Sequence, residues 1–329
     1  MNLPPTNGIR VPIEELRKLV AAIFRAVPIP EEHAQLIADL LADTDLRGVV
    51  SHGVTQVERY VGSYREGTAN THPNVRVLQE GPVTAALSGD GGLGIVVATQ
   101  AMQMAIAKAK EMGVGVTTTT CHDHIGSAGK YVRIAMHEEM IGISFSGRNA
   151  APTYGEESTI QGSIQGSPPL AFGMPAGPDQ PYFMLDMASH MPWDEAFFEK
   201  MPQVFFKAIG LSHVANIMSG TLGGQMLPEF DRQRIQYTGA NQSGFFLALD
   251  IERFVPLQTF TEDIDHLMVE VSKMKPFPGF SEATLPGGLE WQREKNYMKD
   301  GIPISGEAAK SLEQLADEFG LPIPWQHTT

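Results

Sequence analysis

The pair Ser51-His52 and the residue Asp186 carry side chains suited to acid–base chemistry. Histidine donates or accepts a proton near neutral pH, and a neighbouring hydroxyl or carboxylate can orient its ring. Asp186 ends an apolar, strand-like stretch, where a carboxylate is costly to bury without a partner such as a histidine. These three residues predict an acid–base set. The alternatives are a helix cap beside a surface histidine, and a strand-end cap for Asp186.

A second polar stretch, CHDHIGSAG at residues 121–129, follows a predicted strand and precedes a predicted helix. This is where α/β proteins place ligands. Cys121, His122 and His124 could be imagined as metal ligands, but neighbours on an extended chain point to opposite faces and further ligands would have to come from elsewhere. The stretch therefore favours a substrate or cofactor loop, and we predict no metal site.

Gly89, Gly91 and Gly94 form a G-x-G-x-x-G pattern between a predicted strand and a predicted helix. Such a pattern can hold a pyrophosphate at a helix N-terminus. The acidic residue expected on a second strand is missing, because Glu111 lies at a helix end instead. A turn that needs glycine at positive φ is the favoured interpretation.

The elements that must position these residues follow from hydrophobic spacing. Helical patterns occupy 11–45 and 54–64, and from about residue 73 short apolar strands at 83–87, 114–120, 141–146, 170–174, 182–187 and 244–250 alternate with helices. Helical patterns at 261–274 and 306–319 follow. We predict an α/β protein with a central mixed-sheet domain at 76–280. A helical domain would combine the N-terminal segment 1–75 with the C-terminal segment 281–329.

Composition excludes several classes of protein. The chain has 329 residues with 24 Lys and Arg against 38 Asp and Glu, a formal net charge of −14. Nucleic acids and anionic membranes require basic patches, so we expect neither as a partner. The single cysteine, Cys121, excludes a disulfide within the chain and favours a cytoplasmic location, as does the lack of a recognisable signal or membrane segment.

Together these motifs resemble the malate/L-lactate dehydrogenase family, which is unrelated to Rossmann-type dehydrogenases and includes ureidoglycolate dehydrogenase, diketogulonate reductase and piperideine or pyrroline carboxylate reductases. The resemblance extends from about Val11 to Pro324. The matching segments are Ser51-His52-Gly53, 90–94, 124–129, 166–169, 186–189, 207–220 and 285–287.

The resemblance implies a non-Rossmann fold, a homodimer and NAD or NADP as cofactor. His52 would be the proton donor to a carbonyl or imine, and Ser51 and Asp186 would form a relay that positions and charges it. Family membership further implies a set of residues that line the cofactor: His124, Ile125, Gly126, Ser127, Ala128, Asp186, Met187, Ala188, Ser189, Phe205, Phe206 and Lys207.

The chain departs from the family pattern around the substrate. Gln56 replaces the arginine that usually holds the substrate carboxylate, and Arg59, one helical turn further, is a candidate substitute. Ser167, in Gly-Ser-Pro-Pro where the family has Gly-Thr-Asn-Pro, and His124 complete the predicted substrate-binding residues. The stretch between Ser189 and Lys207 is shorter than in the family, which removes part of the wall beside the nicotinamide.

These observations favour an NAD(P)-dependent oxidoreductase that reduces a small 2-oxo acid or cyclic imine, or oxidises a 2-hydroxy acid. The alternative is a cofactor-independent acid–base enzyme (a lyase, isomerase or cyclase) that kept the Ser-His-Asp set but lost nicotinamide binding. A non-catalytic binding protein with the same dimer fold is a third hypothesis.

Overall fold

The computed structural model describes residues 4–148, 160–163 and 167–326, and it divides into two compact units. Unit 1 comprises Met1–His72, Ala176–Phe183 and Ile264–Thr329, and unit 2 comprises Pro73–Pro175 and Met184–Asp263. Residues 176–183 and 264–280, which the sequence groups with the central domain, fall in unit 1. The domain boundaries predicted from the sequence, at residues 75 and 280, stay predictions.

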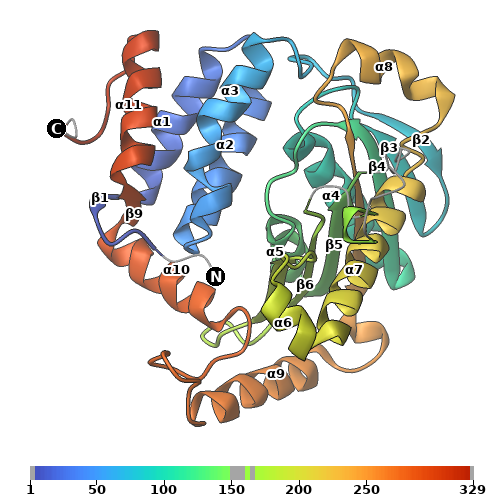
Figure 1. The fold of residues 1–329 in the computed structure, drawn as a ribbon, viewed down its shortest axis with the longest axis vertical. Helices are drawn as coiled ribbons and strands as arrows, with labels where there is room; N and C mark the ends of the chain where they lie inside the picture. The colour runs from blue at the N-terminus through green and yellow to red at the C-terminus, as the bar shows by residue number, and fades with distance from the viewer. Residues whose placement is uncertain (1–3, 149–159, 164–166, 327–329) are drawn as a thin grey trace. The chain divides into compact units, whose positions relative to one another are not determined.

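Unit 1 is mainly helical and joins the two ends of the chain (Figure 1). Strand β1 pairs antiparallel with β9, with Gly8 opposite Ser305 and Val11 opposite Ile302. Helix α1 buries Leu16, Val20 and Ile23 at helical spacing, which is why this stretch folds as an amphipathic helix. The elements of this unit are β1 (Gly8–Val11), α1 (Ile13–Arg25), α2 (Glu31–Leu46), α3 (Val57–Arg65), α10 (Gly288–Asp300), β9 (Ile302–Ser305) and α11 (Gly306–Phe319).

Unit 2 contains a seven-stranded sheet in the order β2-β3-β4-β8-β5-β6-β7. The pair β3 and β4 is parallel, whereas β2–β3, β4–β8, β8–β5 and β5–β6 are antiparallel, so the sheet is mixed. The strands are β2 (Arg76–Glu80), β3 (Thr84–Ser88), β4 (Val114–His122), β5 (Met140–Gly147), β6 (Pro169–Met174), β7 (Phe183–Ala188) and β8 (Gln242–Asp250).

Helices cover both faces of this sheet. The long helix α4 and the shorter α5 pack on one face through a core that includes Ala101, Ala105, Tyr131 and Phe246. The opposite face is packed by α7, whose Ala215 joins Phe145 and Phe245. The helices are α4 (Gly94–Met112), α5 (Gly129–His137), α6 (Glu195–Lys200), α7 (Pro202–Asn216) with a π-helical turn at Ile217–Thr221, and α8 (Asp231–Gln236), and α9 (Leu257–Ser272) crosses from unit 2 into unit 1.

The predicted fold class, a mixed-sheet α/β domain with a helical domain from both chain ends, is confirmed. Each predicted strand matches an observed one within one or two residues. The sequence missed β2, all five residues of which are exposed, because an exposed edge strand lacks the apolar run that was used as the signal. It also missed β1 and β9, which are only four residues long each.

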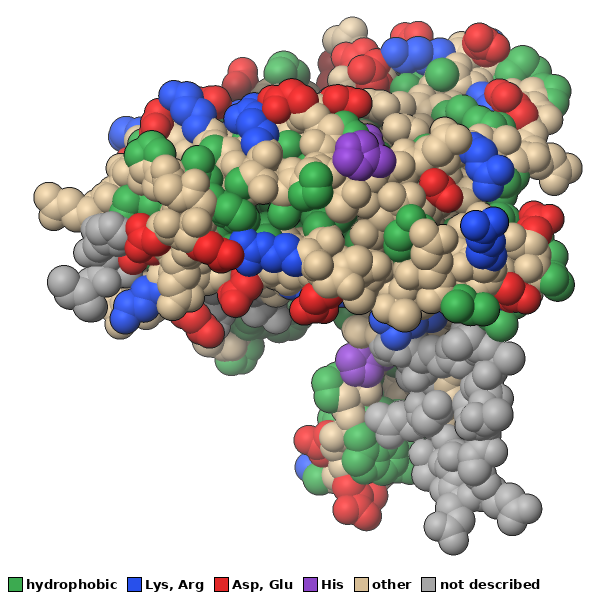
Figure 2. Space-filling model, turned by 90° about the horizontal axis from the view of Figure 1, so that it is seen from above, with side chains coloured by type: hydrophobic (Ala, Val, Ile, Leu, Met, Phe, Trp, Pro, Cys, Tyr) green, Lys and Arg blue, Asp and Glu red, His purple; other side chains and the backbone are tan. Residues whose placement is uncertain are grey.

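Acidic and basic side chains are interspersed on the face of the molecule drawn in Figure 2. No helix in the described part of the chain is long and apolar enough to cross a membrane.

The contact between α4 and strand β4 at Gly115 tests this packing. A Cβ at Gly115 of β4 would lie 1.9 Å from the Ala105 carbonyl oxygen of α4, and backbone cannot yield as a flexible side chain can. Gly115→Ala should therefore lower the free energy of unfolding by about 3 kcal/mol. The matched control is Gly306→Ala, where an added Cβ meets nothing within 4 Å. Equal denaturation midpoints for the two variants would contradict this account.

Candidate functional site

The Ser51-His52 pair lies in a short turn of unit 1 between α2 and α3. Two 3₁₀ turns, Val50–His52 and Val54–Gln56, make up this connection. Ser51 Oγ lies 2.9 Å from Nδ1 of His52, so the serine hydroxyl is positioned to hold the imidazole ring. The histidine is partly exposed, which leaves it within reach of a ligand.

A buried carboxylate that the sequence analysis missed holds this turn. Asp45, in the last turn of α2, is 2% exposed, and its Oδ2 accepts the backbone N–H of Val54 at 2.6 Å. A Cβ at Gly53 would lie about 2.1 Å from this carboxyl group, so only glycine fits between His52 and Val54. The glycine of the Ser-His-Gly motif is thus explained by Asp45. The sequence held a signal for this role, because Asp45 is an acidic residue on the face of α2 that also carries the buried Leu41 and Ala42.

Two predicted substrate residues interact with the same turn. Gln56 Nε2 donates to the carbonyl oxygen of Ser51 at 2.8 Å, and Arg59 donates to Gln56 Oε1 at 3.4 Å. Gln56 therefore braces the backbone of Ser51 in this structure. Its role in substrate binding, like that of Arg59, stays a prediction.

In unit 2, the end of β4 is organised around a buried histidine. His122 is fully buried; Nδ1 donates to the carbonyl oxygen of Asp123 at 2.7 Å, so Nε2 accepts from Thr119 Oγ1 at 2.8 Å. Burial lowers the pKa of His122 to about 4 and raises the pKa of the Cys121 thiol to about 11. Both side chains are used structurally. Among the described residues no group of three or more His, Cys, Asp or Glu side chains could hold a metal ion.

The glycine-rich loop packs against this strand end. A Cβ at Gly89 would lie 2.7 Å from the Cβ of His122, and one at Gly94 would lie 2.2 Å from the carbonyl oxygen of Asp123. Gly91 has φ +77° and faces the ring of Tyr237. The pattern is explained by close packing and a positive-φ turn, in agreement with the interpretation favoured from the sequence.

The structure brings Asp186 together with the 124–129 loop. A Cβ at Gly129, the first residue of α5, would lie 2.4 Å from Asp186 Oδ2, so the carboxylate of β7 rests against the start of the helix. Gly126 has φ +77°, and a Cβ there would lie 2.7 Å from Nζ of Lys130, which is 1% exposed. Ser51 and His52 belong to unit 1 and Asp186 to unit 2, and the predicted relay stays a prediction.

The predicted cofactor residues differ in exposure. Ile125 and Ala128 are fully buried, and Ser189 Oγ donates to the Pro168 carbonyl oxygen at 2.6 Å, so these three side chains pack internally. Ser127 Oγ is buried without a hydrogen-bond partner and is therefore a polar atom in need of one. The exposed members of the set are Met187, Ala188, Phe206 and Lys207.

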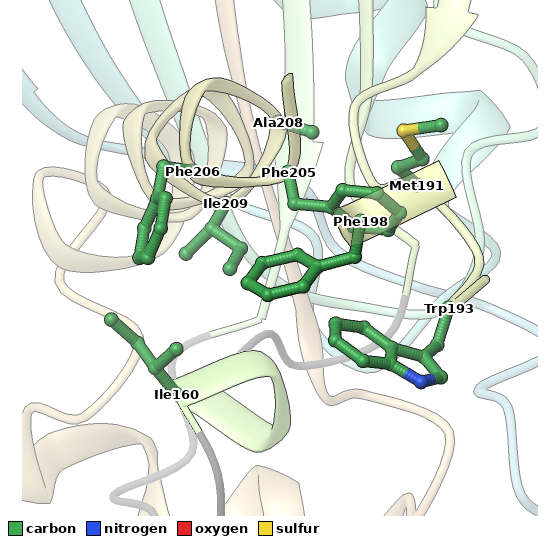
Figure 3. A pocket seen from close by; sticks show the side chains of 8 residues that line it. All are labelled: Ile160, Met191, Trp193, Phe198, Phe205, Phe206, Ala208 and Ile209. Atoms are coloured by element: carbon green, nitrogen blue, oxygen red, sulfur yellow. The ribbon is translucent and has the colours of Figure 1, made fainter. Parts of the chain in front are cut away.

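Phe205 and Phe206 line an apolar cavity of about 500 Å³ in unit 2 (Figure 3). We call it the aromatic cavity; its lining residues are Ile160, Met191, Trp193, Phe198, Phe205, Phe206, Ala208 and Ile209. From the sequence, Phe205 and Phe206 are predicted to line the cofactor and the stretch before Lys207 is described as shorter than in the family; the cofactor role of both rings stays a prediction. The predicted substrate residue Ser167 is linked to this cavity through His190. Its Oγ lies 3.0 Å from Nδ1 of His190, which precedes the lining residue Met191 in the chain.

Comparisons with known proteins match this chain to one family of dehydrogenases. The model of the family described as "Malate/L-lactate dehydrogenase" matches residues 11–192 and 199–313. Malate dehydrogenase of Pyrococcus horikoshii is 33% identical, with 96% of this chain and 97% of that protein covered. The L-sulfolactate dehydrogenase of Methanocaldococcus jannaschii is 29% identical, covering 94% and 97% of the two chains.

The solved structures agree. The Pyrococcus horikoshii malate dehydrogenase structure superposes with a TM-score of 0.81 at 32% identity, covering 98% of this chain and 99% of that one. A more distant malate dehydrogenase, from Entamoeba histolytica, has a TM-score of 0.82 at 23% identity and shows the same fold.

The buried His122 predicts a pH dependence of stability. Its pKa is about 4 in the folded protein against 6.5 for the free side chain, so between these values the unfolded chain binds a proton that the folded chain does not. Stability should fall by about 3 kcal/mol as pH decreases through this window. His122→Asn should remove this slope while lowering stability at neutral pH, whereas the exposed-site control His266→Gln should keep it. Denaturant titrations across the window measure both; an unchanged slope in His122→Asn would refute the assignment.

Proposed function

The chain belongs to the malate/L-lactate dehydrogenase family, and from this membership we propose that it is an NAD(P)-dependent oxidoreductase. Its substrate would be a small 2-oxo acid or cyclic imine in the direction of reduction, or a 2-hydroxy acid in the direction of oxidation. The names of the relatives, malate and L-sulfolactate dehydrogenase, support a hydroxy acid, and ureidoglycolate dehydrogenase (NAD(+)) of Escherichia coli, 26% identical, supports NAD.

The observation that carries the proposal is the Ser51–His52 contact of 2.9 Å in a turn held by Asp45. With Ser51 on Nδ1, we assign proton donation to Nε2, the nitrogen on the far side of the ring. In the direction of reduction, the imidazolium protonates the carbonyl oxygen or imine nitrogen as the carbon accepts a hydride, and His52 ends neutral. Asp186 is proposed as the positioning residue that favours the charged ring.

The described residues fit a nicotinamide dinucleotide in part. The partnerless Ser127 hydroxyl offers a hydrogen bond within the 124–128 loop, and the exposed Lys207 offers a positive charge for a phosphate. Ser127, His124 and Lys207, with the exposed Met187, would hold the group. When bound, it supplies or accepts the hydride. Ile125, Ala128 and Ser189 would contribute backbone only, because their side chains pack inside unit 2.

One observation favours the second candidate, a cofactor-independent acid–base enzyme. Gln56 stands where the family's carboxylate-binding arginine is expected, and its amide is used to hold Ser51. A fluorescence titration with NADH and NADPH distinguishes the two, since binding of neither cofactor at millimolar concentration would favour the second candidate.

Replacing His52 tests the catalytic assignment. His52→Gln keeps a polar side chain but cannot donate a proton as an imidazolium does, so kcat should fall about 10²- to 10⁴-fold while NADH binding is retained. The control His137→Gln, at an exposed end of α5, should keep full activity. Activity is followed as loss of NADH absorbance with a panel of 2-oxo acids and cyclic imines. Near-normal activity of His52→Gln would exclude the proposed proton donor.

We further propose a cytoplasmic homodimer that acts on a small molecule and binds neither nucleic acid nor membrane. The solvent-facing side of α7 and of the π-helical turn that follows it carries an apolar stripe at helical spacing: Gly210, Val214 and Ile217. Val214 is 47% and Ile217 54% exposed. Such a stripe on a helix surface is typical of a protein–protein contact, and a self-complementary one closes a dimer. The proposed cytoplasmic location rests on the single, buried cysteine.

A charge placed in this stripe should break the dimer. Val214→Glu buries an unpaired carboxylate in the proposed contact, so the variant should sediment as a monomer where the wild type sediments as a dimer. The matched control is Ile235→Glu on α8, at a residue 79% exposed outside the stripe, which should remain dimeric. A monomeric wild type, or a dimeric Val214→Glu protein, would contradict the assignment.

A further inference from the structure

Part of the aromatic cavity is built by a segment that lies outside the family match. The family model matches up to residue 192 and resumes at 199, so residues 193–198 lie outside the match. This unmatched segment supplies Trp193 and Phe198, two of the rings that line the cavity. The other six lining residues lie within the matched segments, so the aromatic cavity combines family segments with two rings from a segment outside the match.

The segment forms an ordered wall. Asp194 caps α6 by accepting the backbone N–H of Phe197 at 2.8 Å, which fixes the turn that follows Trp193. The ring centroids of Trp193 and Phe198 lie 4.9 Å apart, and those of Phe198 and Phe205 lie 5.5 Å apart, within the range of stacked and edge contacts. Phe205 is 3% exposed and anchors this group to unit 2.

The wall leaves apolar surface open to solvent. Trp193 is 53%, Phe206 54% and Ile160 60% exposed, and their side chains face the same space in Figure 3. Exposed apolar area costs about 25 cal/mol per Å², so a ligand that covers it gains free energy. The cavity volume of about 500 Å³ lies in the range of small-molecule sites, about 300 to 1,000 Å³.

The chemistry of the lining selects the ligand. Among the described residues that line the cavity, the Trp193 indole N–H is the one conventional hydrogen-bonding side-chain group, so these residues offer almost nothing to the polar edges of an adenine ring. It suits a hydrocarbon ring or a large aliphatic group. The predicted substrate residue Ser167 contacts His190, and the next residue, Met191, lines the cavity.

We propose that the aromatic cavity binds the side chain of the substrate, and that the substrate class is 2-oxo or 2-hydroxy acids with an aromatic or large aliphatic side chain. This inference rests on the proposed dehydrogenase function. The proposed preference distinguishes this protein from an enzyme that acts on small substrates, because a substrate of the size of malate or pyruvate would leave the cavity unfilled.

Steady-state kinetics test the preference. Wild-type kcat/KM with NADH or NADPH should be about tenfold or more higher for phenylpyruvate than for pyruvate, since a filled apolar pocket discriminates on that scale. Phe198→Ala should remove most of this preference by lowering kcat/KM for phenylpyruvate, with little change for pyruvate. The matched control Phe254→Ala, at a residue 69% exposed elsewhere in unit 2, should keep the preference.

A binding measurement separates this inference from the proposed function. Phenyllactate should change the tryptophan fluorescence of the wild type and of Trp325→Phe, but not that of Trp193→Phe. If no 2-oxo acid is reduced, the dehydrogenase proposal fails, and a Trp193-dependent signal would still support the cavity as the site of the aromatic group. Turnover of pyruvate and phenylpyruvate at equal kcat/KM without such a signal would overturn the inference. So would sedimentation showing that Phe198→Ala makes the protein monomeric with an unchanged preference, since the cavity would then hold a second copy of the chain.

Discussion

The neutral, buried His122 at the end of β4 is the interaction on which unit 2 depends. Its two ring nitrogens are satisfied by Thr119 and by the Asp123 carbonyl oxygen, so the strand ends in a fixed bend with Cys121 at φ +54°. The glycine-rich loop packs against this bend because its glycines carry no Cβ. His124, which follows Asp123, begins the loop that we propose to bind the cofactor. A charged His122 could not remain there without a counter-charge, which is why burial depresses its pKa.

A similar principle governs the Ser51-His52 turn in unit 1. The Asp45 carboxylate accepts the Val54 N–H, and Gly53 provides the space for it. A short turn between two helices would otherwise sample several conformations. One buried charge-assisted hydrogen bond and one missing side chain restrict it to a conformation in which Ser51 meets the imidazole. The proposed proton donor is therefore placed by residues that do not react.

The aromatic cavity shows how a family fold can be adapted locally. The sheet, the β4–α5 loop and the Ser-His-Gly turn all lie within the segments that match the family, whereas residues 193–198 do not. The stretch between Ser189 and Lys207 is rich in rings that contact one another. Residues outside the family match thus contribute two rings to an apolar wall on the family fold.

The sequence by itself determined the fold class, most strands and helices, and the family, because period and composition reflect which face of each element is buried. It also identified Ser51 and His52 as neighbours, since they are adjacent in the chain. Only the tertiary structure decided the rest. Asp45 and Gly53, Asp186 and Gly129, and Trp193 and Phe205 are each brought together by folding. His122 and His124 look alike in the sequence, and burial alone makes the first a structural residue with a depressed pKa. Such distinctions depend on what surrounds a side chain in space, which spacing along the chain does not specify.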